Sequence, residues 1–373
     1  MNQKIFKVID SDHNARNGIL KTYHGDIDTP VFMPVGTLGN VKAIFPKDLE
    51  KIGVKIILGN TYHLMLRPGE DLINRFGGLH KFMGWNKPIL TDSGGFQIWS
   101  LSKLRKISDD GVIFNSHIDG LKYKLSPEKS VNIQKKLNSN ITMVLDECTN
   151  FPATHSDCLN SLNLTYKWAK RSLKSYIKRE GFGIFAIVQG GMFQDLRKLS
   201  AIQLVDMNFD GYAIGGLSVG ESHKMMIEIV KHTTQFLPKE KPRYLMGVGR
   251  PIDIFNAVES GIDMFDCVLP TRFGRNGRAF TTLGEINLRN KKFSEDKTPL
   301  DLNIDCYVSK KFTKGYIHHL TKSNEILSAM ILSLHNIAFY EKMMSDIRHS
   351  IKNKEFQKVK SEYSKIHEKY EKS

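Results

Sequence analysis

Short apolar runs recur along this chain, and each ends in aspartate, glutamine or glycine. Residues 88–91 precede Asp92, residues 141–145 precede Asp146, residues 184–188 precede Gln189, and residues 262–265 precede Asp266. Two more runs, residues 212–214 and 243–246, open onto Gly215-Gly216 and Gly247. Runs of this length and composition fit buried strands of a parallel sheet. The carboxyl ends of such strands can converge, so we expect the polar endings to line one pocket.

Strand and helix patterns alternate over residues 41–290, which predicts parallel strands joined by right-handed crossovers. A doubly wound sheet would gather its ligands at one switch point, whereas polar endings recur here along the whole series. The expected fold is therefore α/β, a TIM (β/α)8 barrel over residues 41–290. An N-terminal β segment over residues 1–40 precedes it. An α-rich subdomain over residues 291–373 follows, with a long helix at 325–340 and a polar, exposed helix at 354–373.

Composition narrows the class of protein further. The net charge of +15 favours a polyanionic partner, although lysine-rich drift of an AT-rich genome would give the same charge. No apolar run approaches the roughly 20 residues of a membrane span, and the N-terminus lacks the apolar core of a signal peptide. Four widely spaced cysteines do not suggest a disulfide framework. We expect a cytoplasmic protein without a membrane partner. No glycine-rich phosphate loop indicates a nucleotide cofactor.

Asp92 and Asp266 are the candidates for catalysis. Two carboxylates at facing strand ends can divide the work at an anomeric carbon, where one attacks and the other handles the proton of the leaving group. Their environments must differ, so that one stays ionised while the other exchanges a proton. A single aspartate at a strand end often only caps the following helix, so the argument rests on the pair.

Other strand ends suit recognition of a flat heterocycle. Asp146, Gln189 and the backbone at Gly216 offer donors and acceptors for a purine-like edge, although Gln189 could equally close a backbone turn. Phe96 and Met246 could sandwich a ring or belong to the core. Residues 271–278 carry Arg272, Arg275 and Arg278 among glycines, and are expected to form a loop suited to a phosphate backbone.

Five motifs together resemble one enzyme family. Residues 92–97, 146–149, 188–191, 215–221 and 265–272 stand in the order and spacing typical of the bacterial tRNA-guanine transglycosylases, or queuine tRNA-ribosyltransferases. The resemblance covers nearly the full chain. It implies a TIM barrel that replaces guanine at the wobble position of GUN anticodons with 7-aminomethyl-7-deazaguanine, a step of queuosine biosynthesis. It also implies a covalent ribosyl-aspartate intermediate, tRNA as partner and a homodimer.

The resemblance also implies roles for individual residues. Asp266 would be the nucleophile and Asp92 the general acid/base, while Val219 and Cys148 match enzymes that take the aminomethyl base rather than whole queuine. The implied base-binding residues are Asp92, Ser93, Gly94, Gly95, Phe96, Asp146, Gln189, Gly215, Gly216 and Met246. The implied RNA-binding residues are Gly247, Val248, Gly249, Arg250, Pro251, Ile252, Asp253, Thr271, Arg272, Phe273, Gly274 and Arg275.

One departure from the family pattern concerns a metal. The family carries a structural zinc in a Cys-x-Cys-x-x-Cys stretch with a distant histidine, but here only Cys306 and His335 match, and Ile304 and Ser309 replace the other two ligands. A closed zinc site takes four N or S donors. His318 and His319 lie nearby in sequence, yet we expect the zinc to be lost, apolar packing around Ile304 to replace it, and no cofactor to be needed.

Two other functions remain open from the sequence. A barrel glycosidase would also use paired carboxylates, but the arginines after Asp266 argue against a carbohydrate substrate. A non-catalytic tRNA-binding subunit would not need both Asp92 and Asp266, although the missing zinc ligands keep this alternative open.

Overall fold

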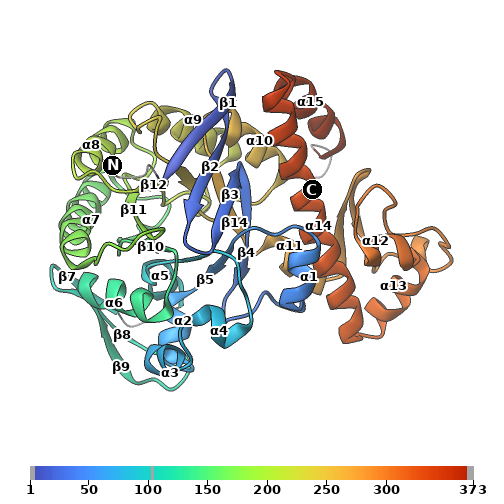
Figure 1. The fold of residues 1–373 in the computed structure, drawn as a ribbon, viewed down its shortest axis with the longest axis horizontal. Helices are drawn as coiled ribbons and strands as arrows, with labels where there is room; N and C mark the ends of the chain where they lie inside the picture. The colour runs from blue at the N-terminus through green and yellow to red at the C-terminus, as the bar shows by residue number, and fades with distance from the viewer. Residues whose placement is uncertain (1–4, 102–104, 368–373) are drawn as a thin grey trace.

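The centre of the molecule is a closed barrel of eight parallel strands (Figure 1). The computed structural model describes residues 5–101 and 105–367. The barrel runs in the order β10-β11-β12-β13-β14-β4-β5-β6. Its strands are β4 (Val31–Gly36), β5 (Ile57–Gly59), β6 (Ile89–Thr91), β10 (Ile141–Met143), β11 (Gly183–Val188), β12 (Gly211–Ile214), β13 (Arg243–Leu245) and β14 (Met264–Cys267). The predicted TIM barrel is confirmed.

The barrel begins earlier than the sequence indicated. Its first strand, β4, lies within the segment assigned to residues 1–40, and it closes the barrel by pairing with β14, from Val31 opposite Met264 to Pro34 opposite Cys267. Pro34 cannot donate a ladder hydrogen bond, so this run did not read as a barrel strand. The N-terminal β segment is a separate antiparallel sheet of β1 (Phe6–Asp12), β2 (Ala15–Thr22) and β3 (Gly25–Thr29). Residues 1–4 lie outside the described residues.

Helices follow the strands and cover the barrel. Those up to the last barrel strand are α1 (Pro46–Lys51), α2 (Thr61–Leu66), α3 (Glu70–Arg75), α4 (Leu79–Met83), α5 (Gly95–Leu101), α6 (Pro127–Leu137), α7 (His155–Ser175), α8 (Gln194–Val205), α9 (His223–Thr234) and α10 (Pro251–Glu259). Local sequence sets their starts: the Ser126 hydroxyl caps α6 before Pro127, and Thr154 forms a capping box on α7. A small sheet of β7 (Arg105–Ser108), β8 (Gly111–Asn115) and β9 (Lys122–Leu125) is inserted before α6.

Residues beyond the barrel form a lobe at its side (right in Figure 1). Its elements are α11 (Leu269–Arg275), β15 (Arg278–Thr281), β16 (Gly284–Asn287), η1 (Lys291–Phe293), α12 (Tyr307–Lys311), α13 (Lys314–Lys322), α14 (Ile326–Lys352) and α15 (Phe356–His367). The long helix α14 lies between α12, α13 and the barrel, and many of its side chains are buried. No helix among the described residues has both the length and the apolar character that crossing a membrane requires.

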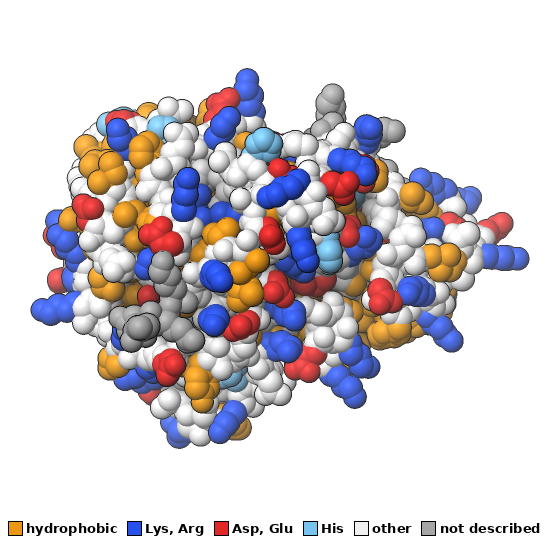
Figure 2. Space-filling model, turned by 45° about the horizontal axis from the view of Figure 1, so that its top comes forward, with side chains coloured by type: hydrophobic (Ala, Val, Ile, Leu, Met, Phe, Trp, Pro, Cys, Tyr) orange, Lys and Arg blue, Asp and Glu red, His pale blue; other side chains and the backbone are white. Residues whose placement is uncertain are grey.

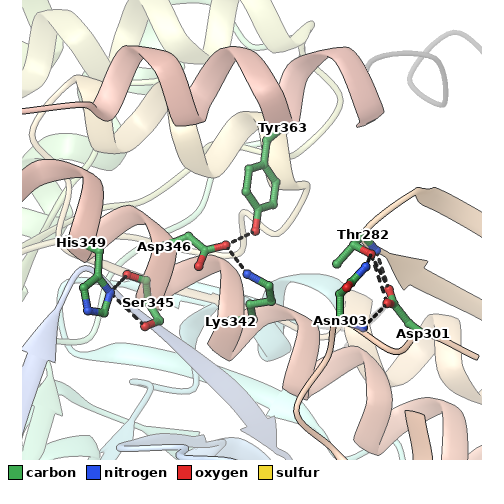
Figure 3. A network of polar contacts seen from close by, with 8 residues as sticks. All are labelled: Thr282, Asp301, Asn303, Lys342, Ser345, Asp346, His349 and Tyr363. Atoms are coloured by element: carbon green, nitrogen blue, oxygen red, sulfur yellow. Dashed lines mark hydrogen bonds and ion pairs between the residues drawn. The ribbon is translucent and has the colours of Figure 1, made fainter. Parts of the chain in front are cut away.

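The last described helix is not the exposed element that the sequence predicted. One side of α15, with Phe356, Tyr363 and His367, packs against the rest of the protein. The Tyr363 ring lies 4.8 Å from that of Phe255. Figure 3 shows how Asp346 of α14 fixes this contact, since its carboxylate accepts bonds from Lys342 Nζ at 2.7 Å and from Tyr363 Oη at 2.8 Å. A stripe of so few apolar residues is easily missed in a lysine-rich segment. Residues 368–373 lie outside the described residues.

Candidate active site

Asp92 is held rigidly at the carboxyl end of β6. The backbone N–H of Thr61 donates to its Oδ1 at 2.8 Å, the Asn60 side-chain amide donates to its Oδ2, and Thr61 Oγ1 donates to the Asp92 carbonyl at 2.5 Å. Burial raises the pKa of Asp92 from 3.8 to about 6; the bonds from Asn60 and Thr61 oppose this shift. Such a carboxyl group can exchange a proton near neutral pH.

Asp266 lies within β14 and not just past its end, as the sequence suggested. The Tyr244 hydroxyl donates to its Oδ1 at 2.5 Å, and the Gly247 backbone N–H donates to the same oxygen at 2.8 Å. Burial raises the pKa of Asp266, and these two bonds favour the ionised form. Because both bonds fall on Oδ1, the lone pairs of Oδ2 remain available for attack.

The two carboxylates share one region of the barrel mouth. Strands β4 and β5 separate β6 from β14 in the barrel order, so Asp92 and Asp266 approach from well-separated parts of the rim. The negative charge of Asp266 contributes to the raised pKa of Asp92, and both carboxylates raise the pKa of Tyr244. The two carboxylates therefore interact electrostatically.

A chain of hydrogen bonds links three strand ends beside these carboxylates. Asp146 accepts from Ser93 Oγ at 3.2 Å and from Gln189 Nε2 at 2.7 Å, and the Cys148 thiol lies 3.7 Å from Asp146 Oδ2. All but Cys148 are buried. The side chain of Gln189 therefore points toward Asp146 and does not close its own turn. Ser93, Asp146 and Gln189 thus form a recognition wall, which offers carboxylate oxygens and an amide to a planar ligand.

Glycines make room for that wall. A Cβ on Gly216, whose φ is +65°, would lie 2.4 Å from Gln189 Oε1, and one on Gly95 would lie 2.6 Å from the Asp146 carbonyl oxygen. Both positions require glycine because the wall approaches the backbone closely. Gly94 and Gly215 adjoin these positions. Phe96 is 47% exposed at the start of α5, and Met246 is half-buried after β13.

The chain is similar to known proteins over nearly its whole length. The sequence model described as queuine tRNA-ribosyltransferase matches residues 10–369. The chain belongs to the queuine tRNA-ribosyltransferase family. A queuine tRNA-ribosyltransferase of Rickettsia bellii (strain OSU 85-389) is 52% identical over 351 residues, covering 94% of this chain and 97% of the relative. That of Rickettsia typhi (strain ATCC VR-144 / Wilmington) is 53% identical over 352 residues, covering 94% and 98%.

The segments expected to meet RNA are only partly accessible in this member of the queuine tRNA-ribosyltransferase family. Gly247, Arg272 and Arg275 are exposed, and Arg250 is half-buried. The remaining residues of the expected RNA-binding set are buried: Val248, Gly249, Pro251, Ile252, Asp253, Thr271, Phe273 and Gly274. Residues 271–275 are also helical, in α11, rather than a loop.

The arginines after Asp266 divide into two groups. Partial burial, and then the nearby charge of Arg272, lower the pKa of Arg275; both residues are exposed to solvent. Arg278 instead forms an ion pair with Glu285 and lies 4.2 Å above the Phe273 ring. Lysines and arginines are spread over the face in Figure 2, interspersed with acidic side chains, so net charge alone does not locate an RNA site.

Sequence reasoning missed four residues that shape the site. Asn60 and Thr61 were given no role from the sequence, and Tyr244 was recognised only as part of a strand. Arg197, fully buried, was missed as well; it donates to the carbonyl oxygens of Val188, Gly215 and Gly191 at 2.8–2.9 Å and so fixes the loops of the recognition wall. A buried arginine in an amphipathic helix is the one signal that could have pointed to it.

The residues at the family zinc position do not fit a zinc ion. Ser309 lies beside His335, backbone hydrogen bonds join Ser309 to Cys306 and Cys306 to Ile304, and all four residues are buried. However, only two are zinc ligands, and among residues 5–101 and 105–367 no three His, Cys, Asp or Glu side chains are grouped to hold a metal. His318 does not complete the site, because it forms no group of three such side chains with Cys306 and His335.

Proposed function

We propose that this protein is a tRNA-guanine transglycosylase that exchanges guanine at the wobble position of GUN anticodons for 7-aminomethyl-7-deazaguanine, a step of queuosine biosynthesis. The observation that carries the proposal is the pair Asp92 and Asp266 at one barrel mouth, beside the wall of Ser93, Asp146 and Gln189. Two carboxylates in different environments and a polar wall for a flat base are the parts that such an exchange needs.

In the first half of the reaction, Asp266 acts as nucleophile. Its Oδ2 attacks C1′ of the target ribose while Tyr244 and Gly247 hold Oδ1, and the C1′–N9 bond breaks. Asp92 gives its proton to the departing guanine and becomes a carboxylate. The product is a ribosyl ester of Asp266, and the RNA backbone stays intact.

The second half reverses these roles with a new base. N9–H of the incoming deazaguanine loses its proton to the Asp92 carboxylate, N9 attacks C1′, and the ester bond to Asp266 breaks. Because one base leaves before the other enters, the kinetics are ping-pong. A pKa of about 6 lets Asp92 serve as acid and then as base.

The wall near Asp146 would hold the base. The Asp146 carboxylate accepts N–H groups of the guanine-like edge, the Gln189 amide and the backbone at Gly216 supply complementary groups, and Phe96 and Met246 flank the ring. Val219 limits the room near the substituent at C7; its N–H is fixed by the Glu221 carboxylate at 2.9 Å. We therefore expect the aminomethyl base to be incorporated far better than queuine. Equal incorporation of both in parallel assays would contradict this.

The RNA is proposed to lie across the exposed part of the rim. A stacked base cannot reach Asp266, so the target nucleotide must turn out of the anticodon loop. We expect Arg250, Arg272 and Arg275, whose side chains are at least partly accessible, to contact its phosphates. We propose a cytoplasmic location, where tRNA and the free base are available.

A homodimer is proposed from the apolar surface of the lobe. Leu302, Tyr307, Tyr316 and Ile326 are 64%, 58%, 42% and 76% exposed. All four side chains belong to the same lobe, and a large exposed apolar patch is typical of an interface. Light scattering should give twice the chain mass, and Tyr316→Asp should halve it; a monomeric wild type would contradict the dimer.

The activity is tested by exchange of radiolabelled guanine into unmodified tRNA. We expect exchange by the wild type and none above background by Asp266→Ala or Asp92→Ala. All three proteins should still bind tRNA, which shows that they are folded. A wild type that binds tRNA but exchanges no guanine would instead favour a non-catalytic tRNA-binding subunit.

A further inference from the structure

A buried histidine joins three elements of the C-terminal lobe without a metal. His335 of α14 is fully buried, its Nδ1 lies 2.8 Å from Ser309 Oγ of α12, and its Nε2 lies 2.8 Å from the Phe280 carbonyl oxygen of β15. A carbonyl oxygen can only accept, so Nε2 carries the proton and Nδ1 accepts from the Ser309 hydroxyl.

Both nitrogens of His335 are therefore occupied by protein partners. A metal would need the Nδ1 lone pair, which Ser309 already uses. Ile304, also fully buried, offers only carbon where a ligand would stand, and Cys306 is the single thiol of the cluster. Neither the types of side chain nor the hydrogen bonding of His335 suits a four-ligand zinc site.

The next residue extends the same junction toward the active site. Asn336 accepts from the Phe280 N–H at 2.9 Å and donates from Nδ2 to the carbonyl oxygens of Pro270 at 2.9 Å and Arg278 at 3.1 Å. Pro270 lies in the first turn of α11, the helix that carries Arg272 and Arg275. The junction thus ties α14 to the segment that follows Asp266.

A second set of hydrogen bonds fixes the loop before Ile304. The Asp301 carboxylate accepts from the Thr282 N–H at 2.7 Å and from the Asn303 N–H at 2.9 Å, as Figure 3 shows. It joins the start of the α12 segment to the β15–β16 turn by hydrogen bonds alone. Hydrogen bonds therefore already hold together α12, α14 and the β15–β16 hairpin, the elements that a four-ligand zinc would join.

We propose that this chain has replaced the structural zinc of its family with a metal-free junction, in which Ser309–His335–Phe280 and the apolar side chain of Ile304 take the place of four ligands. This refines the expectation of purely apolar packing, since the centre of the junction is a hydrogen-bonded histidine. It does not depend on the proposed activity, because its tests measure metal and stability.

The first test uses the untagged full-length protein. After incubation with equimolar zinc and desalting, elemental analysis should find no stoichiometric zinc, and the melting temperature should be the same with and without EDTA. Stoichiometric zinc that survives desalting, or a melting temperature that EDTA lowers, would overturn the proposal.

The second test restores the ligands. The double variant Ile304→Cys with Ser309→Cys would place three thiols and His335 around one point, so it should bind stoichiometric zinc and become sensitive to EDTA. The matched variant Ile304→Ala with Ser309→Ala should bind none. A folded double-cysteine variant that stays free of zinc would contradict the placement of the four side chains. If that variant fails to fold, the wild-type measurements decide.

Discussion

The hydroxyl of Tyr244 should set the pH at which the nucleophile becomes active. It donates to Asp266 Oδ1 at 2.5 Å inside the barrel, and burial together with the nearby carboxylates raises its own pKa well above the ordinary value, so it stays protonated. Tyr244→Phe removes this bond and little else. The carboxylate then loses a donor that favours its ionised form, and the pKa of Asp266 must rise.

The size of the shift follows from the bond that is lost. A hydrogen bond to a charged group is worth about 1.5–3 kcal/mol. Since one pKa unit corresponds to about 1.4 kcal/mol, the pKa of Asp266 should rise by about 1–2. Attack on C1′ requires the ionised form, so the acid limb of the kcat/KM profile should move to higher pH by the same amount.

The assay is guanine exchange into tRNA, measured across pH for the wild type, Tyr244→Phe and Tyr212→Phe. Tyr212 is equally buried on the neighbouring strand β12, and its hydroxyl interacts with Phe209 and Asp210 rather than with Asp266. The control should keep the wild-type acid limb. If the Tyr244→Phe profile superimposes on that of the wild type, the reasoning about Asp266 is refuted.

Three further predictions concern stability, base binding and RNA binding. The pKa of Asp92 is raised from 3.8 to about 6, so its ionisation costs stability as pH rises through this window. This cost is about 3 kcal/mol, and Asp92→Asn removes it while losing one hydrogen bond worth about 1 kcal/mol. The variant should thus unfold at higher urea than the wild type at pH 8 but not at pH 4. An equal difference at both pH values would contradict the shift. Gly216→Ala would place Cβ 2.4 Å from Gln189 Oε1, so KM for the base should rise at least tenfold while tRNA affinity is kept; unchanged KM would contradict the wall. Removing Arg272 and Arg275 together should weaken tRNA binding and lower the slope of log Kd against log salt by about 1–2, whereas Lys231→Ala on α9 should not; an unchanged slope would exclude both from phosphate contact.

The parts of the site that the sequence revealed are those tied to strand ends. Asp92, Asp146 and Gln189 each follow an apolar run, and the parallel fold alone brings such positions together. Tyr244 and Asn60 could not be assigned in this way. Tyr244 sits inside a three-residue strand whose inward face the sequence does not mark, and the role of Asn60 depends on a contact with a residue 32 positions away.

Each error in the predicted fold can be traced to particular residues. Pro34 made β4 hard to recognise, and the glycines and arginines of residues 271–278 resembled a loop although Pro270 stands in the first turn of α11. In α15, lysines outnumber the few residues that turn inward. For β4 and α15, tertiary packing rather than local propensity decides the structure.

The central claim is that Asp266 carries the ribose while the base is exchanged. The most direct measurement is mass spectrometry of the denatured protein. The protein is first incubated with unmodified tRNA without free base, then denatured, and the attached RNA is digested with nuclease. The account predicts a ribonucleotide adduct on the peptide that contains Asp266, absent from Asp266→Ala and discharged when 7-aminomethyl-7-deazaguanine is added before denaturation. An adduct on another residue, or active enzyme that never forms one, would contradict it.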